Sequence, residues 1–171
     1  MIEHRLIERM IAIVGRTPDD IAARRSVDPA FVDTVVDFMR TYADRIHHGK
    51  EEQIMIPLLE TKPISDTDRT IIREIIGEHA LGRKITEEMF EANTRYRNGD
   101  QAALDIIAGK LDMLAEYYPR HVEKEEKIFF PAARAYVTEE EDQAMIREFI
   151  EFDRNFIQDK YIDLVTGLEG R

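Results

Sequence analysis

Residues 47–57 read HHGKEEQIMIP, and the stretch recurs 74 positions later as HVEKEEKIFFP at residues 121–131. The two stretches align without gaps, and histidine, lysine, the paired glutamates, isoleucine and proline all recur in register. A shorter echo, offset by 75 positions, matches Glu3-His4 to Glu78-His79. Each half of the chain therefore carries one histidine near the start of a helix-length segment and a His-x-x-x-Glu pair about 43 positions later.

The His-x-x-x-Glu spacing places both side chains of a pair on one face of a helix. Residues four apart lie about 40° apart around the axis of an α-helix and about 6 Å apart along it. In an antiparallel bundle, two such faces can converge with the single histidines of the other two helices. We therefore predict an interior cluster of four imidazoles and two carboxylates, made of His4, His47, Glu51, His79, His121 and Glu125.

Such a cluster favours a metal site. Buried carboxylates are costly without partners, and metal ions are their usual compensation. Nitrogen and oxygen donors without thiolate suit iron, manganese or zinc, and a carboxylate can bridge two ions. The alternative is a solvated charge pair on each helix. Four of the five histidines, however, occupy equivalent places in the two halves, and an exposed charged face has no reason to keep that register.

The spacing of apolar residues predicts helices over almost the whole chain. Intervals of three and four residues predict helices over about 2–14, 29–57, 66–97, 100–136 and 138–165, and no useful stretch alternates like a strand. Long amphipathic helices joined by short loops pack as antiparallel neighbours. The predicted fold class is all-α, an up-and-down four-helix bundle with an additional C-terminal helix.

Several boundaries carry capping signals. Asp28-Pro29 reads as an N-cap followed by proline at the first helical position, and residues 138–141 read as a capping box. Gly15 and the Thr17-Pro18-Asp19 stretch interrupt the first helix, with a capped turn expected after them. Pro119 predicts a kink just before His121.

We expect a single domain over residues 1–171, with the ligand-bearing bundle in about 1–136 and the extra helix in about 138–166. The extra helix carries no ligand candidate. It is expected either to cover the end of the bundle or to form a homodimer contact, and its large apolar residues are Phe149, Phe152, Phe156 and Tyr161.

Composition narrows the classes of function. The net charge of −11 disfavours binding to nucleic acid or to an anionic membrane surface. The longest apolar run near the N-terminus, residues 10–14, is far short of the roughly 20 residues that span a membrane. The chain has no cysteine, which excludes disulfides, thiolate zinc sites and iron–sulfur clusters. A cytoplasmic protein is the default expectation.

Other residues near the repeat have less defined roles. His48 also has a glutamate four positions on, Glu52, but the second repeat has Val122 at the position of His48, so the aligned pair His47/Glu51 is preferred. His48 itself is expected to be exposed, and the alternatives are that it supports a ligand from behind or is an extra ligand.

Three further residues lie close to the predicted ligands in the sequence. Glu3 and Glu78 each precede a predicted ligand, and the helical step of about 100° turns them toward a surface role. Tyr117 shares the face of His121, and core packing is favoured narrowly over a hydrogen bond at the metal.

At these residues the sequence resembles the hemerythrin-like, or HHE cation-binding, family, from Glu3-His4 through residue 131. The most diagnostic stretches are HHGKEE at residues 47–52 and EHALGR at residues 78–83. The resemblance implies a four-helix bundle that holds a non-haem di-iron centre bridged by two carboxylates and an oxygen species. Carried over by position, the terminal ligands would be His4, His47, His79 and His121, and Glu51 and Glu125 would bridge the metals.

The chain departs from the pattern of the oxygen-carrying hemerythrins. Those proteins use five histidines, two of them one turn apart on the third helix, whereas His79 is followed four positions later by Arg83. They also bridge with one glutamate and one aspartate, whereas both bridging candidates here are glutamates. One iron would then keep an open or water-filled position, which favours sensing, redox chemistry or iron handling over simple oxygen carriage.

The leading hypothesis is a di-iron protein that binds or senses dioxygen, nitric oxide or peroxide, or takes part in iron handling. A redox enzyme on the same centre is an alternative, and so is a bundle that binds zinc or another cation such as manganese without redox chemistry. A metal-free interaction bundle ranks last.

Overall fold

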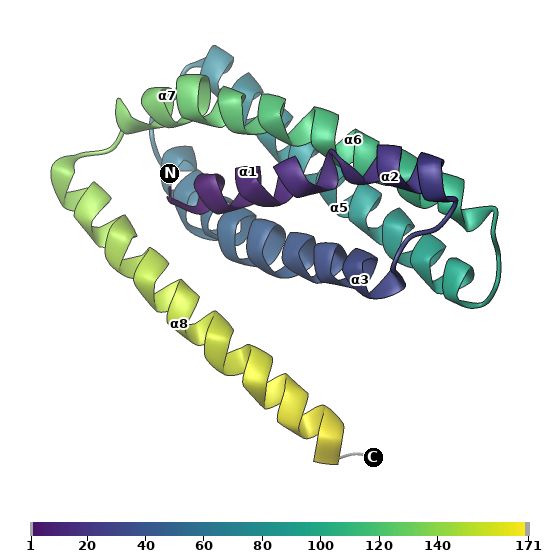
Figure 1. The fold of residues 1–171 in the computed structure, drawn as a ribbon. Coiled ribbons are helices and arrows are strands. Elements are labelled where there is room, and N and C mark those ends of the chain that lie inside the picture. The colour runs from purple at the N-terminus through teal and green to yellow at the C-terminus, as the bar shows by residue number, and fades with distance from the viewer. Residues whose placement is uncertain (1, 170–171) are drawn as a thin grey trace.

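The computed structural model describes residues 2–169, with side chains up to Phe156 in the last helix, so Tyr161 lies outside the described side chains. Four helical arms run alternately up and down, and each packs against the next in a ring (Figure 1). No strand occurs among the described residues, which confirms the all-α fold class. The arms are, in chain order, α1 (Ile2–Val14) with α2 (Thr17–Arg24); α3 (Pro29–Phe38), η1 (Met39–His48), η2 (Glu51–Met55) and α4 (Ile56–Glu60); α5 (Asp66–Arg97); and α6 (Ala103–Lys124), η3 (Glu125–Phe129) and α7 (Phe130–Arg134). The last helix, α8 (Glu139–Glu169), then leaves the bundle at an angle (Figure 1).

The predicted capping signals act as expected. The Asp28 side chain accepts a hydrogen bond from the Ala30 amide at the start of α3. At the start of α8, Thr138 and Glu141 bond to each other's backbone amides, as in a capping box. The interruption after α1 is longer than predicted, because residues 17–24 form the complete helix α2, which packs on α6.

The second and fourth arms each contain wider, π-helical turns where the repeated stretches lie. The Ile56 amide donates to the carbonyl of Glu51, and the Phe130 amide donates to the carbonyl of Glu125, five residues back in both cases. Pro57 follows the first of these turns and Pro131 the second. A proline has no N–H to give and crowds the carbonyl four residues before it, and the wider turn relieves that conflict. The π turns η2 and η3 therefore begin at the two glutamates predicted to bridge metals, whereas the longer π-helical segment η1 begins at Met39. The helix α6 runs through Pro119 without a break.

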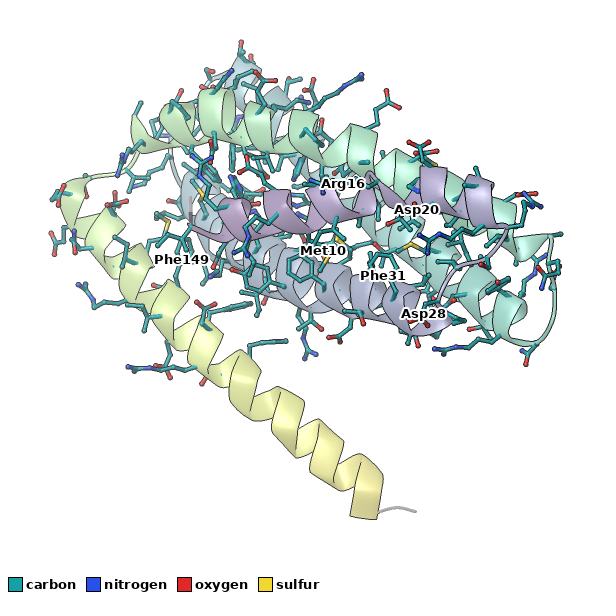
Figure 2. The ribbon with its side chains drawn as sticks, in the orientation of Figure 1. Met10, Arg16, Asp20, Asp28, Phe31 and Phe149 are labelled. Atoms are coloured by element: carbon teal, nitrogen blue, oxygen red, sulfur yellow. The ribbon has the colours of Figure 1, made fainter. Side chains whose placement is uncertain are left out.

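Two apolar clusters fill the bundle on either side of the predicted ligands. The larger cluster joins α1, α3, α5 and α6, and Met10 and Phe31 pack against it from α1 and α3 (Figure 2). The smaller cluster gathers residues around η2, η3 and the start of α8, including Met55, Phe129 and Met145. Met55 and Phe129, which follow the ligand pairs in sequence, are therefore core residues.

The first half of α8 lies across η1 and η2. Lys50 donates to Asp153 at 2.9 Å, and Phe152 packs so close to Gly49 that a Cβ there would lie 2.9 Å from its ring. The homodimer contact through α8 stays a prediction. Among the described residues, no helix combines the length and the apolar character needed to cross a membrane.

Neighbouring isoleucines on α6 test the assignment of the core. Ile107 is fully buried in the larger cluster, whereas Ile106 is 37% exposed. Ile107→Ala leaves a cavity and should lower the free energy of unfolding by about 2–5 kcal/mol. Ile106→Ala, the matched control, should lower it by less than about 1 kcal/mol. Urea denaturation of both variants measures the difference, and equal losses would contradict the assignment.

Candidate metal centre

The structure brings all six predicted ligands into one buried cluster between the two apolar clusters. They come from all four arms, and none is more than 3% exposed. They are His4 on α1, His47 on η1, Glu51 on η2, His79 on α5, His121 on α6 and Glu125 on η3.

The two glutamates lie between the histidines of the two halves. Glu51 turns Oε1 toward His47 Nε2 at 3.7 Å and Oε2 toward His79 Nε2 at 3.3 Å. Glu125 turns Oε2 toward His4 Nε2 at 3.1 Å and Oε1 toward His121 Nε2 at 3.1 Å. Each carboxylate thus turns one oxygen toward a histidine of the first half and the other toward a histidine of the second half, which is the orientation that a carboxylate needs to bridge two ions.

Several inward-facing atoms of this cluster lie near opposite charges but make no hydrogen bond of normal geometry to another described residue. They include both carboxylate oxygens of Glu51, Oε2 of Glu125 and Nε2 of His121. A buried polar group without a partner costs about 1–3 kcal/mol, and more when it is charged. The Nε2 atoms of His4 and His47 also lie 3.0 Å apart. Nitrogens in adjacent positions on one ion have a separation of about 3 Å when each metal–nitrogen bond is about 2.1 Å. The donor set therefore fits divalent cations.

An outer ring of carboxylates holds the histidines from behind. An ionised carboxylate only accepts hydrogen bonds, so each Nδ1 must donate, which leaves the Nε2 lone pair free to face the interior. The contacts are His47 Nδ1 with Glu3 at 3.0 Å, His4 Nδ1 with Glu126 at 3.0 Å, His79 Nδ1 with Glu52 at 2.7 Å and His121 Nδ1 with Glu78 at 2.8 Å. This is the arrangement typical of metal-binding histidines.

The surface role predicted for Glu3 and Glu78 is therefore wrong. The helical step turns each glutamate away from the histidine of its own helix and toward a histidine of the neighbouring helix. Glu3 contacts His47, and Glu78 contacts His121. Their recurrence at the same offset as the histidines is the signal that identifies them.

Cations close the outside of this ring. Lys50 donates to Glu3, and its counterpart in the second repeat, Lys124, donates to Glu78. Burial raises the pKa of Glu3, but hydrogen bonds from His47 and Lys50 outweigh this effect and hold it at about 2. The outer carboxylate is thus ionised at neutral pH.

In the absence of metal, protons on the histidines balance the central carboxylates. Burial lowers the pKa of His47, but hydrogen bonds to Glu125 and Glu3 outweigh it and raise the value to about 9. The pKa of His79 is raised to about 11 against the effect of burial, by hydrogen bonds to Glu125, Glu51 and Glu52. Burial also raises the pKa of Glu125, yet hydrogen bonds from the surrounding histidines hold it well below the usual range.

His48 belongs to the same cluster, in agreement with the alternatives to simple exposure that its position beside His47 left open. It is 1% exposed, so the expectation that it is simply exposed is wrong. Its ring stacks on His79 with centroids 3.8 Å apart, its Nδ1 lies 3.3 Å from Asp44, and its Nε2 has no partner. Burial and the neighbouring histidines lower its pKa.

Two groups of these side chains could each hold an ion. In each group, one donor atom per residue lies within 4.8 Å of the others, and the groups are His4, His47, Glu51 and Glu125, and His48, His79 and His121. Glu52 belongs to neither group, because it contacts His79 Nδ1 from behind. The alternative pair His48/Glu52 is therefore not a ligand pair facing one ion.

Tyr117 has the packing role that was favoured for it. Its hydroxyl donates to the backbone carbonyl of Glu78, and its ring stacks on His121 with centroids 5.5 Å apart. It steadies the imidazole of His121 and the backbone of α5 at once.

Comparison with known proteins agrees with this geometry. The sequence model of the hemerythrin HHE cation binding domain matches residues 1–133 and, in a second overlapping match, residues 70–162. The chain is 24% identical over 149 residues to the uncharacterized protein Rv1995 of Mycobacterium tuberculosis strain H37Rv and, to the same extent, to the uncharacterized protein Mb2018 of Mycobacterium bovis. These alignments cover 87% of this chain and 57% of each relative, so the chain spans little more than half of their length. No solved structure matches.

Proton release on metal binding tests the charge balance of the cluster. At pH 7 the raised pKa values of His47 and His79 keep both imidazoles protonated, and an incoming ion must displace those protons. Binding should therefore release protons at pH 7 and tighten as the pH rises toward 9, where His47 begins to lose its proton unaided. Calorimetric titration with a divalent ion in two buffers of different ionisation enthalpy measures the release. Identical heats in the two buffers would contradict it.

Proposed function

Because the chain belongs to the hemerythrin HHE cation-binding domain family, we propose that it is a non-haem di-iron protein that binds or senses dioxygen, nitric oxide or peroxide. The observation that carries the proposal is the orientation of Glu51 and Glu125, each with one oxygen toward either pair of histidines. One ion would be held by His4 and His47 and the other by His79 and His121. Iron bound there would supply reversible electron transfer and a position for a small molecule.

The residues around the centre limit the access of water. Phe130 stacks on His4 with ring centroids 5.8 Å apart, and Phe129 is buried beside it. The outer carboxylates accept hydrogen bonds from the histidine Nδ1 atoms, which fixes the rings with their Nε2 atoms facing the interior. A site prepared in this way binds cations with little rearrangement of its side chains.

A cavity supports access for a small molecule from one side. About 1040 Å³ of space lies between α8 and the bundle, and it reaches His47 and Glu51. Its lining includes Met55 and Phe130 from the bundle and Phe149 from α8. Figure 2 labels Phe149 on the side of α8 that faces the bundle. Dioxygen and nitric oxide are small and weakly polar, so these apolar side chains suit their entry; charged residues, among them Arg5 and Arg134, line other parts of the cavity.

Metal analysis of the purified protein, together with its visible and near-ultraviolet spectrum, tests the proposal. We expect about two irons per chain after anaerobic loading with ferrous iron, and new absorption bands on exposure to dioxygen, nitric oxide or peroxide. Stoichiometric zinc that ferrous iron does not replace would indicate a cation-binding bundle without redox chemistry. Failure to hold any metal would refute the proposal.

A substitution with a matched control tests the role of the central carboxylate. Glu125→Gln keeps the shape of the side chain but removes the charge that faces both pairs of histidines. The apparent affinity for iron should fall by at least about 100-fold, beyond the 10–100-fold that loss of an outer partner typically costs. Glu123 is the control, because it lies on the same arm but is 60% exposed and paired only with Lys127. Glu123→Gln should bind as the wild type does, and equal affinities for the two variants would count against a bridging role.

The size of the cavity beside His47 also favours a second candidate, a redox enzyme on the same centre. A volume of about 1040 Å³ exceeds what a diatomic molecule needs. Steady-state consumption of peroxide or nitric oxide by the iron-loaded protein with a reductant present would support it. Stoichiometric binding without turnover would favour the binding or sensing protein.

A further inference from the structure

We propose that an apolar cavity between α1 and α6 holds a molecule of weakly polar gas, dioxygen or nitric oxide, on its way to the metal centre. The two helices run side by side (Figure 1). The inference rests on the proposed function, because it concerns the supply of the small molecule that the centre binds. It adds a binding site that lies outside the cluster of ligands.

The cavity has a volume of about 260 Å³, and Glu8 is the single charged residue among the described residues that line it. The Glu8 side chain is 42% exposed and accepts a hydrogen bond from Arg5 at 3.3 Å, so its charge lies toward solvent. An apolar cavity of roughly 150 Å³ stays dry and binds small apolar molecules such as xenon. The cavity between α1 and α6 therefore has the room and the lining that a diatomic gas needs.

A second cavity, of about 220 Å³, occupies the equivalent place in the other half of the bundle. Four residues of α1 that line the apolar cavity have counterparts 75 positions later on α5, and all four counterparts line the second cavity. Among these pairs, Ile11 corresponds to Thr86, and Ala12 corresponds to Glu87. The second cavity thus has polar side chains at places where the first has apolar ones.

The same exchange occurs on the helices opposite. Tyr118 and Val122 of α6 line the apolar cavity, and the residues 74 positions earlier, Asp44 and His48 of η1, line the second cavity. Asp44 is also paired there with Arg83 at 2.7 Å. Polar groups in a cavity of this size hold water, whereas an apolar lining does not. The repeat therefore carries two cavities of similar size and opposite polarity, and the apolar one suits a gas.

The inner wall of the apolar cavity adjoins the candidate metal centre. Ile7 lies one turn from His4 on α1, and Val122 directly follows His121 on α6. The ring of Tyr118 meets the ring of His121 edge-on, with centroids 6.0 Å apart. None of these three wall residues is more than 4% exposed. A gas molecule in the cavity therefore touches side chains that neighbour two predicted ligands.

The cavity beside α8 is the competing way in, since it also reaches the centre. Charged side chains line parts of it, among them Arg5 and Arg134, so it can hold water and polar molecules such as peroxide. The cavity between α1 and α6 has its one charge at the rim. We therefore expect dioxygen and nitric oxide to enter between α1 and α6, and peroxide to enter beside α8.

Xenon binding tests the inference without depending on iron. In the purified protein we expect a saturable shift of the xenon-129 magnetic resonance signal, and one xenon atom between α1 and α6 in crystals under xenon pressure. Ala12→Phe places a ring in the cavity from an exposed position and should abolish both signals. Ile13→Phe is the matched control, because Ile13 is the next residue, is 52% exposed and does not line the cavity. It should bind xenon as the wild type does.

A second variant and a rate measurement extend the test. Val122→Thr keeps the volume of the side chain but adds a hydroxyl to the wall, and it should weaken xenon binding several-fold. In the iron-loaded ferrous protein, Ala12→Phe should slow the reaction with dioxygen or nitric oxide several-fold in stopped-flow mixing and leave the reaction with peroxide unchanged. Ile13→Phe should change neither rate.

No xenon between α1 and α6 in the wild type, or wild-type gas rates in Ala12→Phe, would overturn the inference while leaving the di-iron proposal standing. Xenon binding that disappears as the protein self-associates would show that a second copy covers the cavity, and would also overturn it. If metal analysis shows that the protein holds no iron, the proposed function fails, and the supply of gas to the ions fails with it.

Discussion

Two carboxylates buried in the interior, Glu51 and Glu125, are the constraint on which the rest of the structure depends. They lie where four helices meet, and neither is more than 3% exposed. A pair of negative charges at such a place is stable only if cations face it. The histidines can meet this need in two ways, because they carry protons when no metal is bound and their Nε2 atoms, which face the interior, would be free to hold an ion in place of those protons.

The surrounding side chains continue this alternation of charge outward. Beyond the histidines lie carboxylates, and beyond those carboxylates lie Lys50, Lys124 and Arg83. Lys124 and Arg83 are partly exposed, whereas Lys50 is buried against Asp153 of α8. Each layer fixes the orientation of the one inside it, so the centre depends on hydrogen bonds from all four arms. The apolar clusters on either side limit water and strengthen these interactions. A bundle without loops in its core is well suited to this, since every layer is attached to a rigid helix.

The spacing of apolar residues predicted the four arms, and the repeat predicted that the six central residues lie together. The prediction from the repeat succeeded because two His-x-x-x-Glu pairs on antiparallel helices can both be buried only if they face the shared interior of the bundle. Reasoning about one helix at a time failed for Glu3 and Glu78, because a side chain that points away from the histidine beside it in the sequence can still contact a histidine on the next helix. The helix α2 was missed because its eight residues follow a break with little apolar periodicity. His48 had no signal at all in the repeat.

The surroundings of the cluster differ between its two halves, although the repeated residues themselves match. His48 stands on the side of His79 and His121, whereas the cavity beside α8 opens on the side of His47 and Glu51. Lys50 bonds to Asp153 of α8, while its counterpart Lys124 bonds to Glu74 within the bundle. A duplicated frame alone would hold two equal ions. On one side a cavity between α8 and the bundle reaches His47 and Glu51, and on the other side the ring of His48 packs on His79, so the two halves of the cluster differ in how open they are to a small molecule.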